Sequence, residues 1–323
     1  MSYAARIHEF GGPDVFRWEP ITVGEPGPGK VRLRHTAIGL NFVDVYNRRG
    51  RFPMRFPAVL GNEAAAVIEA VGPGVTQFQP GDRVAYAPFT GSYCEQRLIS
   101  ADKLIALPAN IDDRTAAGMM LAGMTAQYLL RQLHPVEAGE TVLVHAAAGS
   151  VGMILCQWAA ALGARVIGTV SNSEKAQLAR AHGCHEVINY SEENVAQSVS
   201  RITAGEGVNV VYDGVGADTF RGSLQSLKPL GHLIVYGQAS GPIPPFDVHE
   251  LAALGSLTIT VASLQSFIQD LALMRGMARE LFEVVSSGQV RIHIGQTYPL
   301  SEVGHAHRDL EARMTRGSTL LLV

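Results

Sequence analysis

The stretch Val142-Leu143-Val144-His145-Ala146-Ala147-Ala148-Gly149-Ser150-Val151-Gly152 decides the fold of this chain of 323 residues. An apolar run leads into a loop of small residues, and an apolar stretch of helical character, 150–162, follows the loop. A strand that enters a helix through such a turn is typical of a βαβ unit that binds a dinucleotide. Gly149 would let the backbone approach a pyrophosphate, and Gly152 would let the helix lie close to the strand. Ala147 stands where the first glycine of the usual pattern belongs.

Beyond this loop the chain alternates apolar strands with helical stretches. The strands are predicted at 141–146, 165–170, 186–189, 208–213, 232–236 and 257–262, and the first two crossover helices at 150–162 and 173–181. Apolar strands joined by helices predict a parallel, doubly wound sheet with both faces covered. The expected fold class is therefore α/β, with a Rossmann sheet in the middle of the chain.

The regions on either side have a different texture. Residues 1–115 contain many Gly and Pro turn signals between short apolar runs, which is typical of an irregular β domain. After the Rossmann region we expect a helix over 265–287, a strand over 289–297 and a helix over 301–313. The chain ends in an apolar tail, 320–323, which we expect to pair back into the amino-terminal β domain. That domain would then be discontinuous in sequence.

Composition excludes several classes of protein. Lys and Arg number 26 and Asp and Glu 29, so a formal net charge of −3 gives no electrostatic reason to expect binding to nucleic acid or to an anionic membrane. The longest apolar run falls short of a membrane-spanning helix. Three scattered cysteines, Cys94, Cys156 and Cys184, do not form a disulfide framework. With no apolar signal segment at the amino terminus, a cytoplasmic location is predicted.

The end of the second predicted strand indicates which cofactor the sheet would take. A site for NAD usually has an acidic residue there for the ribose hydroxyl, but this strand continues into Ser171, Asn172 and Ser173. Ser171 and Ser173 could donate to a 2′-phosphate, and Lys175 could neutralise it, so NADPH is the predicted cofactor. The alternatives are that Lys175 is an ordinary solvated helix residue and that the glycine turn binds no nucleotide.

Several motifs along the chain resemble the zinc-independent, zeta-crystallin-like quinone oxidoreductases of the medium-chain dehydrogenase/reductase superfamily. They are Gly11-Gly12-Pro13, the segments 37–46, 60–65 and 80–84, the loop 145–152 with 156–159 after it, 211–216, and Arg316-Gly317-Ser318. The resemblance implies a GroES-like catalytic domain made of residues 1–122 and 263–323. It also implies a Rossmann NADPH-binding domain at 123–262.

The resemblance also implies a set of cofactor-binding residues. They are Asn41, Tyr46, Tyr128, Gly149, Ser150, Val151, Gly152, Ser171, Ser173, Lys175, Tyr190, Val215, Gly237, Gln238, Ala239, Ser240, Ser263, Leu264 and Arg313. Asn41 and Tyr46 are also the candidate catalytic residues, because amide and phenol groups can donate to an acceptor oxygen. The alternative for Asn41 and Asp44 is a turn that orders the first domain. Tyr190 could instead be a surface side chain at a strand end.

No metal is expected. Zinc-dependent relatives carry Gly-His-Glu where this chain has Gly61-Asn62-Glu63, and the amide of Asn62 is a poor replacement for an imidazole ligand. His145, on the first predicted strand, is interpreted as a packed and hydrogen-bonded residue. His305 and His307 should lie on opposite sides of one helix. The basic run after Tyr46, from Arg48 to Arg55, is interpreted first as a solvated loop and second as an aid in holding phosphate or an acidic substrate.

These observations predict NADPH-dependent reduction of quinones by hydride transfer, without zinc. An enone or enoyl-thioester reductase is the enzymatic alternative, and a cofactor-binding structural or RNA-binding protein is the alternative from another class. The β-branched run 257–261 should form an edge strand of the sheet. An uncovered edge of this kind favours pairing with a second copy, so a homodimer is expected.

Overall fold

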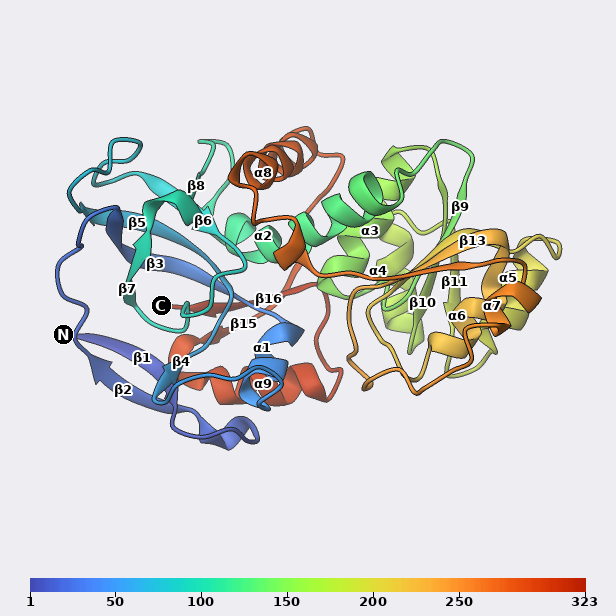
Figure 1. Cartoon of the computed structure of the whole chain (residues 1–323), viewed down its shortest axis with the longest axis horizontal. Helices are drawn as coiled ribbons and strands as arrows, with labels where there is room; N and C mark the ends of the chain where they lie inside the picture. Colours follow the sequence, from blue (N-terminus) through green and yellow to red (C-terminus); the bar gives the residue numbers. More distant parts are fainter. The chain divides into compact units, whose positions relative to one another are not determined.

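The computed structural model describes all 323 residues, which form two compact units (Figure 1). The first unit contains Met1–Met124, Ile268–Ser286 and Ile292–Val323, and the second contains Thr125–Phe267 and Ser287–Arg291. The first unit is therefore discontinuous in sequence, as the apolar carboxyl-terminal tail predicted.

The second unit is built on a six-stranded sheet in the order β11-β10-β9-β12-β13-β14, in which every neighbouring pair is parallel. Its strands are β9 (Thr141–Val144), β10 (Arg165–Val170), β11 (Glu186–Asn189), β12 (Val208–Asp213), β13 (Leu227–Val235) and β14 (Thr258–Val261). All six predicted strands are present. The order reverses between β10 and β12 around the first strand, β9, which makes the sheet doubly wound.

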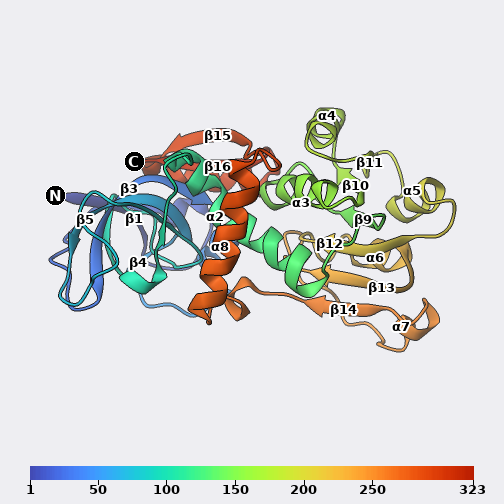
Figure 2. The same ribbon diagram turned by 90° about the horizontal axis from the view of Figure 1, so that it is seen from above.

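Helices cover both faces of this sheet, which explains why its strands are apolar on both sides. They are α3 (Ser150–Ala161), α4 (Ser173–Ala181), α5 (Val195–Ile202), α6 (Phe220–Ser226) and the short α7 (Glu250–Ala253). Figure 2 shows α3 and α4 on one face and α5 and α6 on the other. Buried β-branched and leucine side chains from β9, β10 and β12, such as Leu143, Ile167 and Val211, form the core on one side.

The first unit contains two sheets. A small sheet has the order β2-β1-β4, from β1 (Ser2–Ile7), β2 (Arg17–Ile21) and β4 (Ala58–Val59). The larger has the order β15-β16-β3-β5-β6-β8, with β7 also paired to β3. Its strands are β3 (Lys30–Leu40), β5 (Glu63–Val71), β6 (Arg83–Tyr86), β7 (Gln96–Ser100), β8 (Ile105–Ala106), β15 (Ile294–Pro299) and β16 (Ser318–Leu322).

Four helices belong wholly or mainly to this unit: α1 (Phe42–Arg48), α2 (Asp113–Tyr128), α8 (Leu271–Ser286) and α9 (Val303–Glu311). A π-helical turn, Leu129–Leu133, continues α2. Short 3₁₀ turns lie at Pro13–Val15, Ala101–Lys103, Leu264–Ser266 and Leu300–Glu302.

The carboxyl-terminal tail pairs back into the amino-terminal β domain, as predicted, and it does so as an interior strand of the larger sheet. β16 pairs antiparallel with β3, where Leu320 lies opposite Gly39 and Leu321 opposite Ile38. The Ser318 hydroxyl donates to the carbonyl of Gly118 at 2.6 Å. Leu320 and Leu321 are fully buried, so the last residues complete the core that the first hundred residues begin.

Three predicted boundaries in the last sixty residues are wrong. The helix expected over 265–287 begins at 271, because the carboxylate of Asp270 accepts the N–H groups of Ala272 and Leu273 and caps it there. The strand expected over 289–297 begins at Ile294, because the Gln157 side chain binds both backbone groups of Arg291. The last helix is 303–311 rather than 301–313, since Arg313 has a left-handed φ of +60°.

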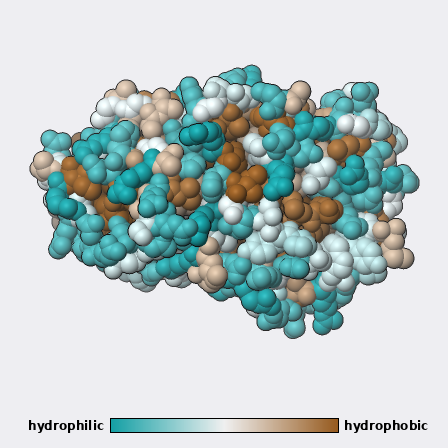
Figure 3. Space-filling view, turned by 180° about the vertical axis from the view of Figure 1, so that it is seen from behind, coloured by the Kyte–Doolittle hydropathy of each residue, from teal (hydrophilic) through white to brown (hydrophobic).

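None of the helices is both long enough and apolar enough to cross a membrane. On the face drawn in Figure 3, hydrophobic side chains form separate patches between hydrophilic ones.

Candidate functional site

The carboxyl ends of the parallel strands collect most of the predicted cofactor residues in the second unit. Because the strands are parallel, the loops that follow them lie at one edge of the sheet. The segments that follow β9, β10, β11, β12 and β13, including the first turns of α3 and α4, carry, in that order, Gly149–Gly152, Ser171–Lys175, Tyr190, Val215 and Gly237–Ser240. The fold therefore brings these residues, predicted one by one, to a single edge.

The loop between β9 and α3 is shaped by small residues. A Cβ on Gly152 would overlap the carbonyl oxygen of Ala146, so only glycine lets the helix lie this close to the strand end. Gly149 caps α3 without a side chain, and its N–H donates to the Ala146 carbonyl at 2.8 Å. A helix N-terminus that has no side-chain cap is a ready site for a pyrophosphate. Ala146 has a left-handed backbone conformation, with a φ of +52°. It lies one position before Ala147, which stands where the first glycine of the usual pattern belongs.

β10 does not end in an acidic residue, and the nearest carboxylate, that of Glu174, lies in the first turn of the helix that follows, α4. An acidic residue there also favours the N-terminus of the helix. The side chain of Asn172 caps α4 by accepting the backbone N–H of Lys175 at 2.9 Å. Ser191 donates its hydroxyl to the carbonyl of Ser171 at 2.9 Å, which holds the ends of β10 and β11 together. Ser173 and Tyr190 are exposed, and Lys175 is half-buried. The loop thus presents hydroxyl, phenol and ammonium groups at the strand end.

Asp213, which the sequence analysis did not select, shapes the loop after β12, and Ser240 ties that loop to the loop after β13. Its carboxylate accepts the N–H groups of Val215 and Gly216 at 2.8 and 3.1 Å, and also hydroxyl donors on α6. Ser240 donates both its N–H and its hydroxyl to the carbonyl of Val215. Two predicted cofactor residues, Val215 and Ser240, are therefore held side by side. The motif 211–216 was the available signal for Asp213.

His145 is a packed, hydrogen-bonded residue, as predicted. Its imidazole lies between Thr169 and Ser223, with both nitrogen–oxygen distances 3.0 Å. Ser223 donates to Asp213 at 2.9 Å, so it accepts from Nε2 of His145, which leaves Nδ1 to accept from Thr169. Burial lowers the pKa of His145, in keeping with a neutral ring. This chain of hydrogen bonds ties β9, β10 and α6 together under the nucleotide loop.

Three other predicted cofactor residues in the second unit lie in different surroundings. Tyr128 is buried, and its ring stacks on Phe267 with centroids 4.6 Å apart. Leu264 is buried in the 3₁₀ turn after β14, and Ser263 caps that turn and is exposed. Tyr128 and Leu264 thus contribute to the interior in this structure.

The first unit holds Asn41, Tyr46 and Arg313. Asn41 caps the amino end of α1 and is buried, and Tyr46 lies in the same helix with its ring 5.4 Å from that of Phe42. Arg313 is exposed in the turn that ends α9. The α1 segment therefore brings the two candidate catalytic residues together, while Arg313 belongs to another element.

A buried hydrogen-bond network orders the start of α1. Asp44 accepts the backbone N–H of Asn41 at 2.9 Å, the hydroxyl of Tyr93 at 2.9 Å and the amide of Asn62 at 2.6 Å. His307 lies 3.2 Å from the Tyr93 hydroxyl through Nε2. Asn41 and Asp44 thus form the turn that was the alternative to a cofactor role, and this turn also fixes where Asn41 lies.

The same network continues to the surface through α9. The guanidinium of Arg48 donates to Nδ1 of His307 at 3.0 Å and pairs with Glu311. His307 is therefore neutral and donates from Nε2 to Tyr93, since its other nitrogen faces a cation. Burial and the charge of Arg48 lower the pKa of His307 to about 3. His305 is exposed, so the two histidines lie on opposite sides of the helix, as predicted.

Glu63 is a residue of the site that the sequence analysis missed, although it stands in the quoted segment 60–65. Its Oε1 accepts from Nδ2 of Asn41 at 2.6 Å, and its Oε2 accepts from the backbone N–H of Leu121 at 2.7 Å. Burial raises the pKa of Glu63 to about 8, and burial raises that of Asp44 to about 6. Both carboxyls are therefore buried and hydrogen-bonded to Asn41, Glu63 through the side-chain amide and Asp44 through the backbone N–H.

The residues here do not fit a zinc ion. The Asn62 amide donates to Asp44 and accepts from the Thr90 hydroxyl at 3.0 Å, so both of its polar atoms are committed. No group of three or more His, Cys, Asp or Glu side chains in the chain is placed to hold a metal.

Three arginines of the basic run after Tyr46 (Arg48, Arg49 and Arg51) contact other side chains of the protein. Arg48 and Arg49 both pair with Glu311, and the guanidinium of Arg51 lies 5.2 Å from the ring centroid of Tyr46. This arrangement favours a structural role for the first two arginines.

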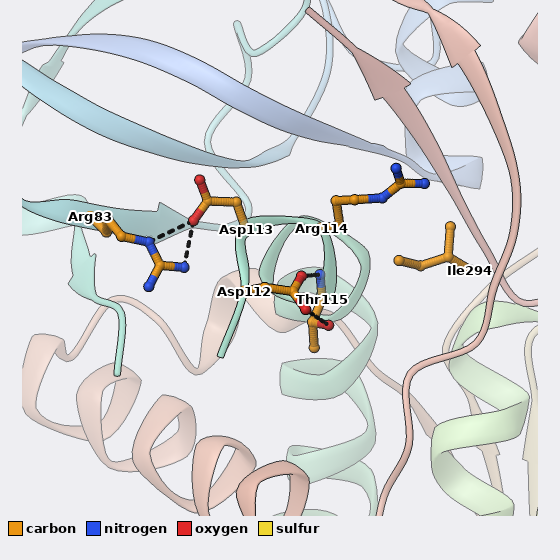
Figure 4. A pocket seen from close by; sticks show the side chains of 6 residues that line it. All are labelled: Arg83, Asp112, Asp113, Arg114, Thr115 and Ile294. Atoms are coloured by element: carbon orange, nitrogen blue, oxygen red, sulfur yellow. Dashed lines mark hydrogen bonds and ion pairs between the residues drawn. The ribbon is translucent and has the colours of Figure 1, made fainter. Parts of the chain in front are cut away.

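A hollow on the first unit, shown in Figure 4, is a separate feature. It is lined by Arg83, Asp112, Asp113, Arg114, Thr115 and Ile294. Arg83 pairs with Asp113 and donates to the Ile111 carbonyl, and Asp112 caps α2 through Thr115. These charges stabilise the start of α2, and the hollow contains none of the predicted site residues.

This chain combines a Rossmann unit with a discontinuous, GroES-like β unit. That combination is the fold of the medium-chain dehydrogenases/reductases. The family description "Alcohol dehydrogenase GroES-like domain" matches residues 27–138, and "Zinc-binding dehydrogenase" matches residues 150–280.

Individual relatives match over the full length. The chain is 48% identical to a quinone oxidoreductase of Pseudomonas aeruginosa, covering all of both chains. It is 49% identical to a 2-haloacrylate reductase of a Burkholderia species, covering 100% of this chain and 99% of the relative. The solved structure of Escherichia coli quinone oxidoreductase complexed with NADPH has a TM-score of 0.97 at 41% identity, covering 99% and 100% of the two chains. The chain belongs to the quinone oxidoreductase family of the medium-chain dehydrogenases/reductases.

Replacing Gly152 tests the packing of α3 on the strand end. Gly152→Ala would place a methyl group against the carbonyl of Ala146, and we expect a loss of about 1–3 kcal/mol in the free energy of unfolding of the second unit. Gly276→Ala in α8 is the control, because nothing lies within 4 Å of its Cβ position, and there we expect a gain of up to about 1 kcal/mol. Denaturant unfolding of both variants measures the difference. A gain from Gly152→Ala would contradict the packing described.

The two buried carboxyls predict how stability depends on pH. The folded-state pKa values of about 6 for Asp44 and about 8 for Glu63 lie above their ordinary values of 3.8 and 4.5. The folded state therefore binds the extra protons, and their stabilisation is lost as the pH rises through about 6 and then about 8. We expect the melting temperature to fall between about pH 5 and about pH 8, and the part of this fall above pH 6 to be largely absent in Glu63→Gln. A melting temperature of the wild type that rises over this range would contradict the assignment.

Proposed function

We propose that the chain transfers a hydride from NADPH to quinones, without zinc. The observation that carries the proposal is the edge of the Rossmann sheet. There the glycine-capped α3 follows β9, and β10 does not end in a carboxylate, since Glu174 lies further on, in the first turn of α4. Ser171, Ser173 and Lys175 stand at the place where an NAD site has its acid. The solved relative named as complexed with NADPH supports the same cofactor.

When bound, NADPH supplies the hydride, and the protein orients the reacting groups and excludes water. Ser150 and Val151 would meet the pyrophosphate at the N-terminus of α3. Tyr190 would lie beside the adenosine. Asn41 and Tyr46 would approach the nicotinamide and the acceptor. The other cofactor contacts carried by the family resemblance are Tyr128, Val215, Gly237, Gln238, Ala239, Ser240, Ser263, Leu264 and Arg313.

A quinone needs little help from the protein to accept electrons. Hydride addition to a conjugated acceptor spreads negative charge over the conjugated system, whereas an unactivated carbonyl develops a localised alkoxide that a metal would stabilise. Hydrogen bonds from the segment 41–46 are then enough to assist. This chemistry is consistent with a donor set that does not fit zinc.

Reduction of a conjugated carbon–carbon double bond is the second candidate. The relative named 2-haloacrylate reductase, at 49% identity, favours it, and the same hydride chemistry would serve. An RNA-binding or structural role has less support, since the formal net charge is −3 and the nucleotide loop is intact. We place the protein in the cytoplasm, where its three free cysteines, Cys94, Cys156 and Cys184, would remain reduced.

The choice of acceptor is tested by oxidation of saturating NADPH with 1,4-benzoquinone, an enone, an acrylate, an aldehyde and, in reverse, a primary alcohol. We expect efficient turnover of benzoquinone and none of the aldehyde or alcohol. Turnover of the enone or acrylate with none of the quinone would favour the second candidate. Alcohol oxidation with no conjugated acceptor turned over would contradict both.

The choice of cofactor is tested at Lys175. Removal of one charged hydrogen bond to the 2′-phosphate should weaken NADPH binding about tenfold or more and leave NADH binding nearly unchanged. Fluorescence titration of Lys175→Ala with both cofactors measures this. Lys228→Ala is the matched control, because Lys228 stands at the amino end of β13 and so at the opposite edge of the sheet. Equal losses of affinity for NADPH and NADH would contradict the assignment of Lys175 to the 2′-phosphate.

The proposed homodimer is tested at the edge of the sheet. β14 is the last strand, it has a partner only on one side, and Val261 is 70% exposed. Antiparallel pairing of two β14 strands would continue the sheet and cover this side chain. We expect a dimer by light scattering at micromolar concentration and a monomer for Val261→Lys. A monomeric wild type would contradict the proposal.

A further inference from the structure

Glu63 is a fully buried carboxyl at the first position of β5, and two N–H donors meet it from different elements. Its Oε1 lies 2.6 Å from Nδ2 of Asn41, and its Oε2 lies 2.7 Å from the backbone nitrogen of Leu121 in α2. The titratable groups nearest to it are Asp44 on α1 and Tyr93 on the loop after β6, and neither is a cation. Glu63 therefore contributes no ion pair and acts only through its two hydrogen bonds.

The carboxyl group cannot move away from Asn41. A Cβ on Gly39 would overlap Oε1 of Glu63 and the carbonyl of Ala117, so the backbone of β3 packs directly against the carboxyl. Asn41 is equally fixed, because its backbone N–H is held by Asp44. The geometry leaves one variable in this pair: which end of the Asn41 amide faces Glu63.

We propose that Glu63 is a positioning residue that sets the polarity of the Asn41 amide, so that Asn41 accepts a hydrogen bond at the nicotinamide end of NADPH. The inference rests on the proposed function, in which Asn41 approaches the nicotinamide. A carboxylate can only accept, so Nδ2 of Asn41 must face it and Oδ1 is turned to the cofactor. Its partner there would be a hydroxyl of the ribose or an N–H of the carboxamide.

Protonation of Glu63 would reverse this polarity. A protonated carboxyl can donate to Oδ1 of Asn41, and the amino group of the amide would then face the cofactor. Burial raises the pKa of Glu63 to about 8, so both forms occur near neutral pH. NADPH should accordingly bind more tightly at pH 9.5 than at pH 7.

Two variants separate positioning from a general structural role. In Glu63→Gln the new amide can accept the N–H of Leu121 and must present an amino group to Asn41, which locks Asn41 in the reversed polarity. In the double variant Asn41→Asp with Glu63→Gln, the carboxylate and the amide exchange places. The hydrogen bond between positions 41 and 63 is kept, and an acceptor oxygen again faces the cofactor. The net charge of the pair is also kept.

The test is fluorescence titration of the full chain with NADPH at pH 7 and pH 9.5, after thermal melting has shown that each variant is folded. At pH 9.5 we expect Glu63→Gln to raise the dissociation constant about tenfold and the double variant to restore it to within about twofold of the wild type. Glu63→Gln, which leaves no ionisable group in the pair, should not show the change between the two pH values that the wild type shows.

The proposal is overturned if Glu63→Gln binds as tightly as the wild type at pH 9.5, or if the double variant binds no better than Glu63→Gln. Should either variant fail to fold, the wild type alone decides, and an affinity that is constant between pH 7 and pH 9.5 overturns the proposal. These outcomes differ from a failure of the proposed function, in which the wild type would neither bind NADPH nor reduce benzoquinone.

Discussion

Asp44, Glu63 and Asp213 are carboxyls that the fold removes from water. Asp44 and Asp213 are held by N–H and O–H donors and Glu63 by two N–H donors, and none of the three is held by a cation. A carboxylate in the interior is tolerated only when donors surround it. Each of the three therefore imposes its geometry on the backbone and side chains that supply the donors. In the first unit the result is the position of Asn41, and in the second it is the shape of the loop that carries Val215.

The same constraint explains how distant segments of sequence are tied together. In the first unit Asp44 is joined through Tyr93 and His307 to Arg48 and Glu311, which links the start of α1 to the last helix. In the second unit Asp213 is joined through Ser223 to His145. Each network lies beneath a loop with predicted cofactor residues. For a reaction in which the cofactor carries the chemistry, a rigid support of this kind is the main contribution that the protein can make.

The parallel sheet, the discontinuous first unit and the nucleotide loop could be predicted from the sequence, because each has a recognisable sequence pattern. Alternation of apolar strands with helices gave the parallel sheet, and an apolar tail of Leu320 to Val323 gave the discontinuous first unit. The nucleotide loop was found because glycine is required where a Cβ would strike the Ala146 carbonyl. Glu63 was missed because its partner, the N–H of Leu121, is 58 residues away and belongs to the backbone. The start of α8 was missed because a single cap, Asp270, outweighs the helical pattern before it.

The claim on which the account depends most is that the protein orients NADPH and a conjugated acceptor for direct hydride transfer, with no part played by a metal. The most direct measurement is stopped-flow oxidation of NADPH by benzoquinone, using protein dialysed against a chelator and assayed for zinc, with NADPH deuterated at either face of C4. The account predicts full activity at negligible zinc content, and slower transfer from only one of the two deuterated cofactors. Activity that follows the zinc content, or that is unaffected by deuterium at both positions when transfer itself limits the rate, would contradict it.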